Sequence, residues 1–332
     1  MLASQKIAIR RSGLLFDQDQ LLQDIDTGRQ MAMTVIRTDH TLNDTDSGQD
    51  IWAQPIPPYT IGNHSISLEI RDEAGRFNIN NLYQNGTVNT AALAVFQRLL
   101  GQLNLEPEIA TAVIDYQDTD RDVYQDGGEE SVVYAQQLNS TSMTSLPNQP
   151  FVSIEQLYEV RGVSAEVLAA LRPYMTAVPY YVPININTAS PVLLAALVDG
   201  ATSQQMQALV EVRMQRAFTS IDEVWQTPVL GILDAEQRAA LTPLLAVDSS
   251  AFTALITASD NPSSSQSRQR FATVLIGKTL IEDNQTATSS NTSIGNSSNE
   301  SSTERNDESS NEKMPKEVTV IMQRLWAFRP SF

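Results

Sequence analysis

The chain has 332 residues, 41% of them hydrophobic, which is enough to build one large or two medium globular units. Its 39 acidic residues outnumber its 22 basic residues, and the net charge of −17 argues against general nucleic-acid binding, because a phosphate backbone repels an acidic protein. The absence of cysteine excludes disulfides, thiolate metal sites and a cysteine nucleophile.

The first predicted element is a long amphipathic helix from about Ile7 to Ile36, because its apolar residues recur every three or four positions. This apolar stripe comprises Leu14, Leu15, Leu21, Leu22, Ile25, Ala32, Val35 and Ile36. Turn formers follow from Asn43 to Pro58. The alternation from His64 to Ile70 then predicts a half-buried strand with its isoleucine and leucine side chains facing inward.

An internal repeat occupies the middle of the chain. FNIN at Phe77–Asn80 matches ININT at Ile184–Thr188, and FVSIEQLY from Phe151 matches FTSIDEVW from Phe218. Each later motif is followed by a leucine-rich helix, so the pattern predicts two copies of one helical unit. The first copy carries an insertion of about 40 residues relative to the second.

The second copy resembles a helix-hairpin-helix module. We expect Asn187 or Thr188 to cap a helix whose first turn contains Pro191, and a second helix from Ser203 to Arg216. Residues 184–247 carry three basic against six acidic residues, so the cations that grip a phosphate in DNA-binding modules are missing.

Strand-prone segments return after Val247, at Ala251–Thr257, Phe271–Ile281 and Glu317–Phe328. Between the last two, residues 283–313 are dominated by Ser, Asn and Thr with almost no apolar residues. Such a segment cannot bury enough apolar surface to order itself, so we predict a disordered insert there.

The insertion in the first copy contains a dense acidic segment at residues 115–130. The spacing of its carboxylates resembles that of a calcium loop, although Val123 stands where a sharp turn requires glycine. Oxygen ligands without histidine or cysteine favour calcium, and the alternative is a solvated acidic loop. The candidate ligands are Asp118, Asp120, Asp122, Asp126, Glu129 and Glu130.

Evidence for an enzyme is weak. The two histidines, His40 and His64, stand near turn-rich sequence, and the chain has neither a glycine-rich phosphate loop nor a His-Glu-x-x-His pair. Glu129 and Glu130 could act as acid and base, but adjacent exposed carboxylates are usually only solvated. We therefore predict that the chain is not an enzyme. It also has no apolar run of about 18 to 20 residues that could span a membrane.

Four stretches resemble the K-type minor pseudopilins of type II secretion, also called general secretion pathway protein K. They are QKIAIRRSGLLFDQDQ near the start, IRDEAGRFNINNL from Ile70, the acidic segment from Ile114 to Tyr134, and ININTASPVLLAAL from Ile184. The resemblance implies an α+β, pilin-like fold in which a long N-terminal helix packs on a small antiparallel sheet and a large all-α domain is inserted between strands. The expected divisions are 1–75 for the helix and first strands, 76–247 for the insertion and 248–332 for the returning strands.

The resemblance also implies a structural role at the pseudopilus tip, which is needed for protein export across the outer membrane. It implies calcium in the acidic region, the I and J minor pseudopilins as partners, and the exoprotein or the secretin as further candidates. The resemblance further implies an upstream prepilin leader and a transmembrane half of the first helix, which would place the chain at the inner membrane, facing the periplasm. We expect Leu14, Leu15, Leu21 and Leu22 to contact the partners. The alternative is a helix-hairpin-helix adaptor that binds nucleic acid or peptides.

Overall fold

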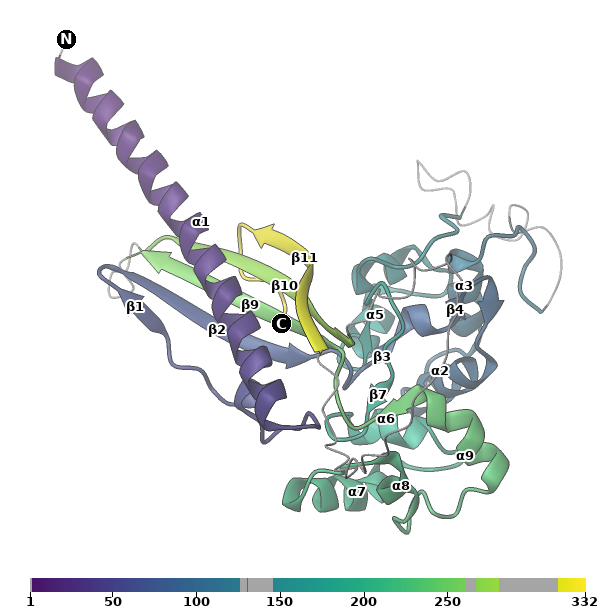
Figure 1. Cartoon of the computed structure of the whole chain (residues 1–332). Coiled ribbons are helices and arrows are strands. Elements are labelled where there is room, and N and C mark those ends of the chain that lie inside the picture. The colour runs from purple at the N-terminus through teal and green to yellow at the C-terminus, as the bar shows by residue number, and fades with distance from the viewer. Residues whose placement is uncertain (1, 126–129, 131–145, 261–266, 281–315) are drawn as a thin grey trace, which may run out of the picture.

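The computed structural model describes residues 2–125, 130, 146–260, 267–280 and 316–332, with side chains from Gln18 onward. This part of the chain forms two masses: a five-stranded sheet crossed by the long helix α1 (Leu2–Leu42), and a cluster of shorter helices (Figure 1). Helices combined with an antiparallel sheet make the fold α+β, as the sequence predicts.

The sheet has the strand order β1-β2-β9-β10-β11, and all neighbouring strands are antiparallel. The strands are β1 (Tyr59–Ile61), β2 (His64–Asp72), β9 (Ala251–Asp260), β10 (Gln269–Leu280) and β11 (Lys316–Trp326). Although β2 and β9 pair along nearly their full lengths, the helical cluster separates them in sequence. The cluster is therefore inserted between two adjacent strands.

Helix α1 covers one face of the sheet over β2, β9 and β10, and its first turns extend beyond the sheet (Figure 1). Its buried apolar residues Leu21, Ile25, Ala32 and Ile36 belong to the same core cluster as the inward-facing residues of the strands. Gly28 permits this close seating, because a Cβ there would lie 2.4 Å from Cγ2 of Ile256 on β9. The predicted amphipathic helix is thus present and is longer than predicted.

Two neighbouring residues of α1 lie in different environments. Leu21 is 3% exposed in the core cluster, so the prediction that it is free to contact a partner is wrong. At this point α1 still lies over the sheet, where Asp24 Oδ2 is 2.9 Å from His64 Nδ1 at the start of β2. Leu22, by contrast, is 38% exposed.

The helical cluster has its own apolar core, in which the rings of Tyr116 and Phe151 stack with centroids 4.3 Å apart. Its α-helices are α2 (Thr90–Gln102), α3 (Glu108–Gln117), α5 (Ala165–Leu171), α6 (Pro191–Ala196), α7 (Ser203–Gln215), α8 (Ile221–Trp225) and α9 (Ala235–Leu241). The 3-10 helices of the described chain are η1 (Ile51–Ala53), η2 (Ile79–Asn81), η3 (Ile154–Glu159) and η4 (Thr242–Leu244). The helical cluster also contains short strands: β3 (Phe77–Asn78), β4 (Tyr83–Gln84), β5 (Thr87–Val88), β6 (Met175–Thr176), β7 (Ile184–Asn185) and β8 (Leu245–Ala246).

The two copies of the predicted repeat are built alike. A parallel bridge, β3 with β6 in the first copy and β7 with β8 in the second, joins the beginning of each copy to its end. The Asn80 amide accepts from the Phe151 N–H and donates to its carbonyl, and Asn187 makes the same two bonds with Phe218. These matching bonds confirm the repeat. They also explain the asparagines, because one buried amide supplies both a donor and an acceptor.

The cap of helix α6 differs from the prediction. Ser190 is its N-cap, and its Oγ accepts from the Leu193 N–H at 3.2 Å, while Pro191 occupies the first turn as expected. Asn187 cannot serve as the cap because its amide already bonds the main chain at Phe218.

Part of the predicted architecture falls outside the described residues, including the predicted disordered insert at 283–313. Between α6 and α7, Gly200 has a φ of 69°, a conformation that favours glycine, and the two helices pack together. The helix-hairpin-helix comparison and the three sequence divisions remain predictions.

Candidate metal centre

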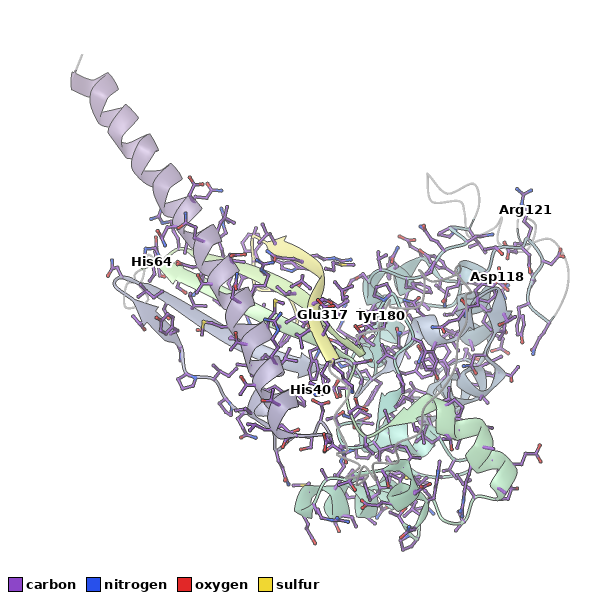
Figure 2. All side chains as sticks on the ribbon, in the orientation of Figure 1. His40, His64, Asp118, Arg121, Tyr180 and Glu317 are labelled. Carbon is purple, nitrogen blue, oxygen red and sulfur yellow. The ribbon has the colours of Figure 1, made fainter. Side chains whose placement is uncertain are left out.

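Three buried carboxylates meet at the C-terminal end of α3. Asp115 lies in the last turn of the helix, Asp118 is its C-cap residue, and Glu130, later in the sequence, lies beside them. One oxygen of each lies within 4.8 Å of the others, and the three residues are 0%, 3% and 5% exposed. Figure 2 shows Asp118 near the end of the helical cluster, with Arg121 extending away from it into solvent.

Local bonds hold two of these groups in place. Asp115 Oδ1 accepts from the Tyr124 N–H at 2.8 Å, and the Glu130 N–H donates to the Arg121 carbonyl at 2.9 Å. The helix explains why Asp115 and Asp118 are neighbours, because residues three apart share one face. It also makes their position costly, because the C-terminal end of a helix carries partial negative charge.

The site has unmet bonding capacity. Asp118 Oδ1 and Glu130 Oε1 are buried and have no hydrogen-bond partner within the described part of the chain. Burial, and then the charges of Asp120 and Asp115, raise the pKa of Asp118 to about 7. Burial, and then the charges of Asp118 and Asp115, likewise raise the pKa of Glu130 to about 7. Burial first, and the neighbouring charges second, therefore disfavour ionisation of Asp118 and Glu130.

A hard divalent cation fits this arrangement. Convergent carboxylate oxygens without nitrogen or sulfur ligands match the preference of calcium, and a cation would satisfy the two orphan oxygens. Asp115, Asp118 and Glu130 are the residues that would hold it. The cation would have a structural role there, because it would neutralise carboxylate charges whose burial is unfavourable.

The predicted ligands are only partly brought together. Asp118 and Glu130 belong to the buried group, whereas Asp120 and Asp122 are exposed and stay outside it. Asp120 Oδ1 accepts from the Asp122 N–H at 2.9 Å, which shapes the turn. Asp126 and Glu129 lie outside the described residues. Asp115 is absent from the predicted ligands, although the acidic segment begins with it.

A second carboxylate group lies at the C-terminal end of α1 and in the segment that follows it. Asp39, Asp46 and Asp50 bring oxygens within 4.8 Å of one another, but Asp46 is ion-paired with the buried ammonium group of Lys278. Burial, and then the charges of Asp50 and Asp46, raise the pKa of Asp39 to about 6. Because a protein cation already pairs with it, this group is a weaker candidate for a metal.

Among the leucines predicted to contact partners, Leu22 has a described side chain that is exposed, whereas the Leu21 side chain is buried. The side chains of Leu14 and Leu15 fall in the part of α1 for which no side chains are described. Among the described helices, α1 included, none combines the length and apolar character that crossing a membrane requires.

Two family models match the chain, and both are described as type II secretion system protein K. One covers residues 75–180 and the other residues 184–248, which together exceed half of the chain. The chain belongs to the type II secretion system protein K family. The two matched ranges follow the two copies of the repeat, because the division between them falls between β6 and β7.

Curated relatives agree with this assignment. The type II secretion system protein K of Pseudomonas aeruginosa is 27% identical over 67% of this chain and 69% of its own length. The Klebsiella pneumoniae protein of the same description is 31% identical over 61% of this chain and 64% of its own. The chain thus spans about two thirds of the length of these protein K relatives.

A solved structure shows the same fold. A chain of the GspK–GspI–GspJ complex from the type 2 secretion system of enterotoxigenic Escherichia coli matches with a TM-score of 0.71, over 95% of this chain and 99% of that chain. The two sequences are 20% identical, so the likeness shows a shared fold over nearly the whole chain.

Proposed function

We propose that this protein K family member is a minor pseudopilin at the tip of the type II secretion pseudopilus, where it supports protein export across the outer membrane. The observation that carries the proposal is the family match over both copies of the helical repeat. A pilin-like arrangement is consistent with it, because α1 lies across an antiparallel sheet and its first turns extend beyond that sheet (Figure 1).

The partners in this proposal are the I and J minor pseudopilins. The likeness to a chain of a GspK–GspI–GspJ complex supports them. A segment before α1 anchors the protein in the inner membrane, with the described part in the periplasm. Calcium at Asp115, Asp118 and Glu130 stabilises the helical cluster, and the exoprotein and the secretin are further candidate partners.

The apolar side of α1 that its own sheet leaves exposed contacts the partners. Leu22 is 38% exposed, and Leu14 and Leu15 precede it by about two helical turns. Side chains at such spacings pack between neighbouring helices. Leu21 is excluded from this contact because it is buried against the sheet.

Co-purification with tagged I and J proteins tests the assembly. Leu22→Glu should abolish capture while leaving the melting temperature nearly unchanged, because the side chain lies outside the core. Leu42→Glu is the matched control, since Leu42 is 69% exposed at the far end of α1 and should still be captured. Unchanged capture of Leu22→Glu, or equal loss with both variants, would contradict the proposal.

A further inference from the structure

A cleft of about 540 Å³ lies between the two masses, on the face of the sheet that α1 leaves uncovered. Strand alternation places Ala254 and Val274 beneath α1, so Thr253 and Thr273 face the other way and form part of the cleft floor. Residues of η3, residues of β6 and the C-terminal residues 330–332 also line it. The volume lies within the range of ligand-binding pockets.

The cleft has a surplus of cations. Among the described residues, its lining holds four arginines, Arg71, Arg76, Arg172 and Arg324, against two glutamates. This is unusual in a chain with 39 acidic and 22 basic residues. A cleft lined by one sign of charge focuses its field on opposite charges nearby.

Not all of this positive charge is used within the protein. Glu73, 2% exposed on its side chain, takes both an Nε and an Nη2 hydrogen bond from Arg71, at 3.1 and 2.8 Å. Arg76, which is half-buried, forms no direct ion pair with a described carboxylate, although its charge also acts on Glu73 and Asp72. Arg324 donates to the Val152 carbonyl at 2.9 Å and likewise has no carboxylate partner there. Arg324 thus remains for an external anion, and Arg76, without a direct ion pair of its own, can add to its binding.

The floor of the cleft is apolar between these arginines. Leu275, Met322 and Trp326 contribute to it, and Trp326 is held by a 2.9 Å hydrogen bond from its Nε1 to Thr273 Oγ1. A ligand with both carboxylates and apolar side chains would therefore find complementary surfaces close together. Arginine is well suited to such ligands, because its planar guanidinium pairs with carboxylates and stacks on aromatic rings.

The chain itself shows how a peptide lies here. Arg329 makes two 2.8 Å contacts to the carboxylate of Glu69 on β2, and the following residues run along the cleft. The ring of Phe332 lies 4.5 Å from the guanidinium carbon of Arg71. A segment with an aromatic side chain thus already lines one side of the cleft.

We propose that this cleft is a docking site for an extended, acidic segment of another protein, with carboxylates bound by Arg76 and Arg324 and an apolar side chain placed on Trp326. The negative net charge of the chain does not prevent this contact at physiological ionic strength, because salt screens the repulsion beyond about 8 Å. The cleft arginines would contact the carboxylates directly, so their attraction is screened much less. The site goes beyond the assembly proposed above and does not require the I and J proteins.

Fluorescence anisotropy on the purified chain tests the site with a labelled peptide, Gly-Asp-Phe-Asp-Leu-Gly, and its counterpart with lysine in place of aspartate. The acidic peptide should bind and the basic one should not. Arg324→Gln should weaken binding at least about tenfold, as loss of a charge-assisted pair does. Arg216→Gln is the matched control, because Arg216 is 74% exposed and lies outside the cleft lining.

Two further variants, at Arg76 and Trp326, test the same site. Arg76→Gln should also weaken binding, and Arg324→Gln remains informative if loss of Arg76 disturbs the buried Glu73. Binding should change the Trp326 fluorescence, and Trp326→Phe should remove that change. Equal binding of both peptides, equal effects of Arg324→Gln and Arg216→Gln, or no binding below about 1 mM would overturn the proposal. Concentration-dependent dimers that Arg324→Gln abolishes would also overturn it, in favour of a second copy as the occupant.

Discussion

Single amides hold each helical repeat together, and Asn187 is the clearest case. Its Nδ2 donates to the carbonyls of Phe218 and Val247, and its Oδ1 accepts from the Phe218 N–H. Asn187→Leu leaves the N–H and carbonyl of Phe218 without these bonds, whereas the Val247 carbonyl keeps its bond from the Asp46 N–H. Each unpaired buried group costs about 1–3 kcal/mol. We expect the free energy of unfolding to fall by about 3 kcal/mol or more.

Urea unfolding followed by circular dichroism measures this loss. Gln204→Leu is the control, because Gln204 is exposed on α7 and its replacement should change the free energy of unfolding by less than about 0.5 kcal/mol. Unfolding of both variants at the same urea concentration would show that the amide bonds do not stabilise the repeat.

The carboxylates at the end of α3 predict how calcium affects stability. The pKa values of Asp118 and Glu130 rise from 3.8 and 4.5 to about 7. Between these values the folded chain binds more protons than the unfolded chain, so without metal its stability falls as pH rises. Calcium binds the ionised carboxylates, so the melting temperature should rise more on adding calcium at about pH 8 than at about pH 5.

Differential scanning fluorimetry in chelator and in calcium measures both effects. Asp72 also has its pKa raised to about 7, by burial first, so the informative quantity is the difference between wild type and Asp118→Asn. Asp118→Asn should remove most of the calcium-dependent gain, whereas Asp122→Asn, at an exposed residue outside the buried group, should keep most of it. A gain that does not depend on pH or on Asp118 would place calcium elsewhere.

The candidate site could be predicted only in part from residue types. The density of acids identifies the segment, and Asp118 and Glu130 do meet. Loop spacing fixes separations along the chain but not burial, so it could not separate Asp118 from the exposed Asp120. Asp115 was missed because it lies in a helix, and a template that counts from Asp118 does not include it.

At the level of elements, the seating of α1 on the sheet depends on a missing side chain. A Cβ at Gly28 would lie 2.4 Å from Cγ2 of Ile256 and 3.1 Å from Cγ2 of Ile66. Both neighbours are β-branched and buried, so they cannot turn away. We expect Gly28→Val to force α1 off β9 and to lower the free energy of unfolding by about 1–3 kcal/mol.

A second helical glycine is the control for this experiment. Gly101, near the end of α2, has nothing within 4 Å of its ideal Cβ position. Gly101→Ala should therefore stabilise the chain, by up to about 1 kcal/mol, through helix propensity alone. Thermal unfolding of the two variants in parallel separates crowding from propensity, and a Gly28→Val variant as stable as wild type would contradict the tight seating.

Elements long enough to show a repeating pattern of apolar residues were predictable from the sequence, whereas very short elements were not. Helix α1, helix α7 and the strands β2, β9, β10 and β11 follow from the sequence pattern, with bounds that differ by a few residues. The parallel bridges β3–β6 and β7–β8 are two residues per strand, too short to show any period. The two strands of each bridge lie far apart in sequence, so the packing of the folded chain determines which strands pair.

Across the whole molecule, a buried polar joint connects the helix-covered sheet to the helical repeats. Asp46, in the loop after α1, donates its N–H to the Val247 carbonyl and accepts from Asn185 Nδ2 at its own carbonyl. Its side chain accepts from the Ser249 N–H and pairs with Lys278 of β10. The family resemblance implies an insertion between strands, but the groups of this joint come from four distant segments and share no motif.

Loss of Lys278 tests how much this joint contributes to stability. Its side chain is 3% exposed and that of Asp46 is 2%, and Asp39 and Asp50 lie close by. Lys278→Met removes the ammonium group from a buried set of carboxylates, and breaking one side of a buried pair costs about 3–5 kcal/mol. We expect urea unfolding to show this loss for sheet and helical signals together, because the joint ties both.

The double variant Asp46→Asn, Lys278→Met separates charge from shape. An amide keeps the bond to the Ser249 N–H but carries no charge, so the double variant should recover part of the stability lost by Lys278→Met. Recovery would mean that the ammonium group mainly offsets the buried carboxylate. A double variant as unstable as Lys278→Met would mean instead that the lysine acts through its packing on the Phe252 ring, 5.5 Å from its Nζ.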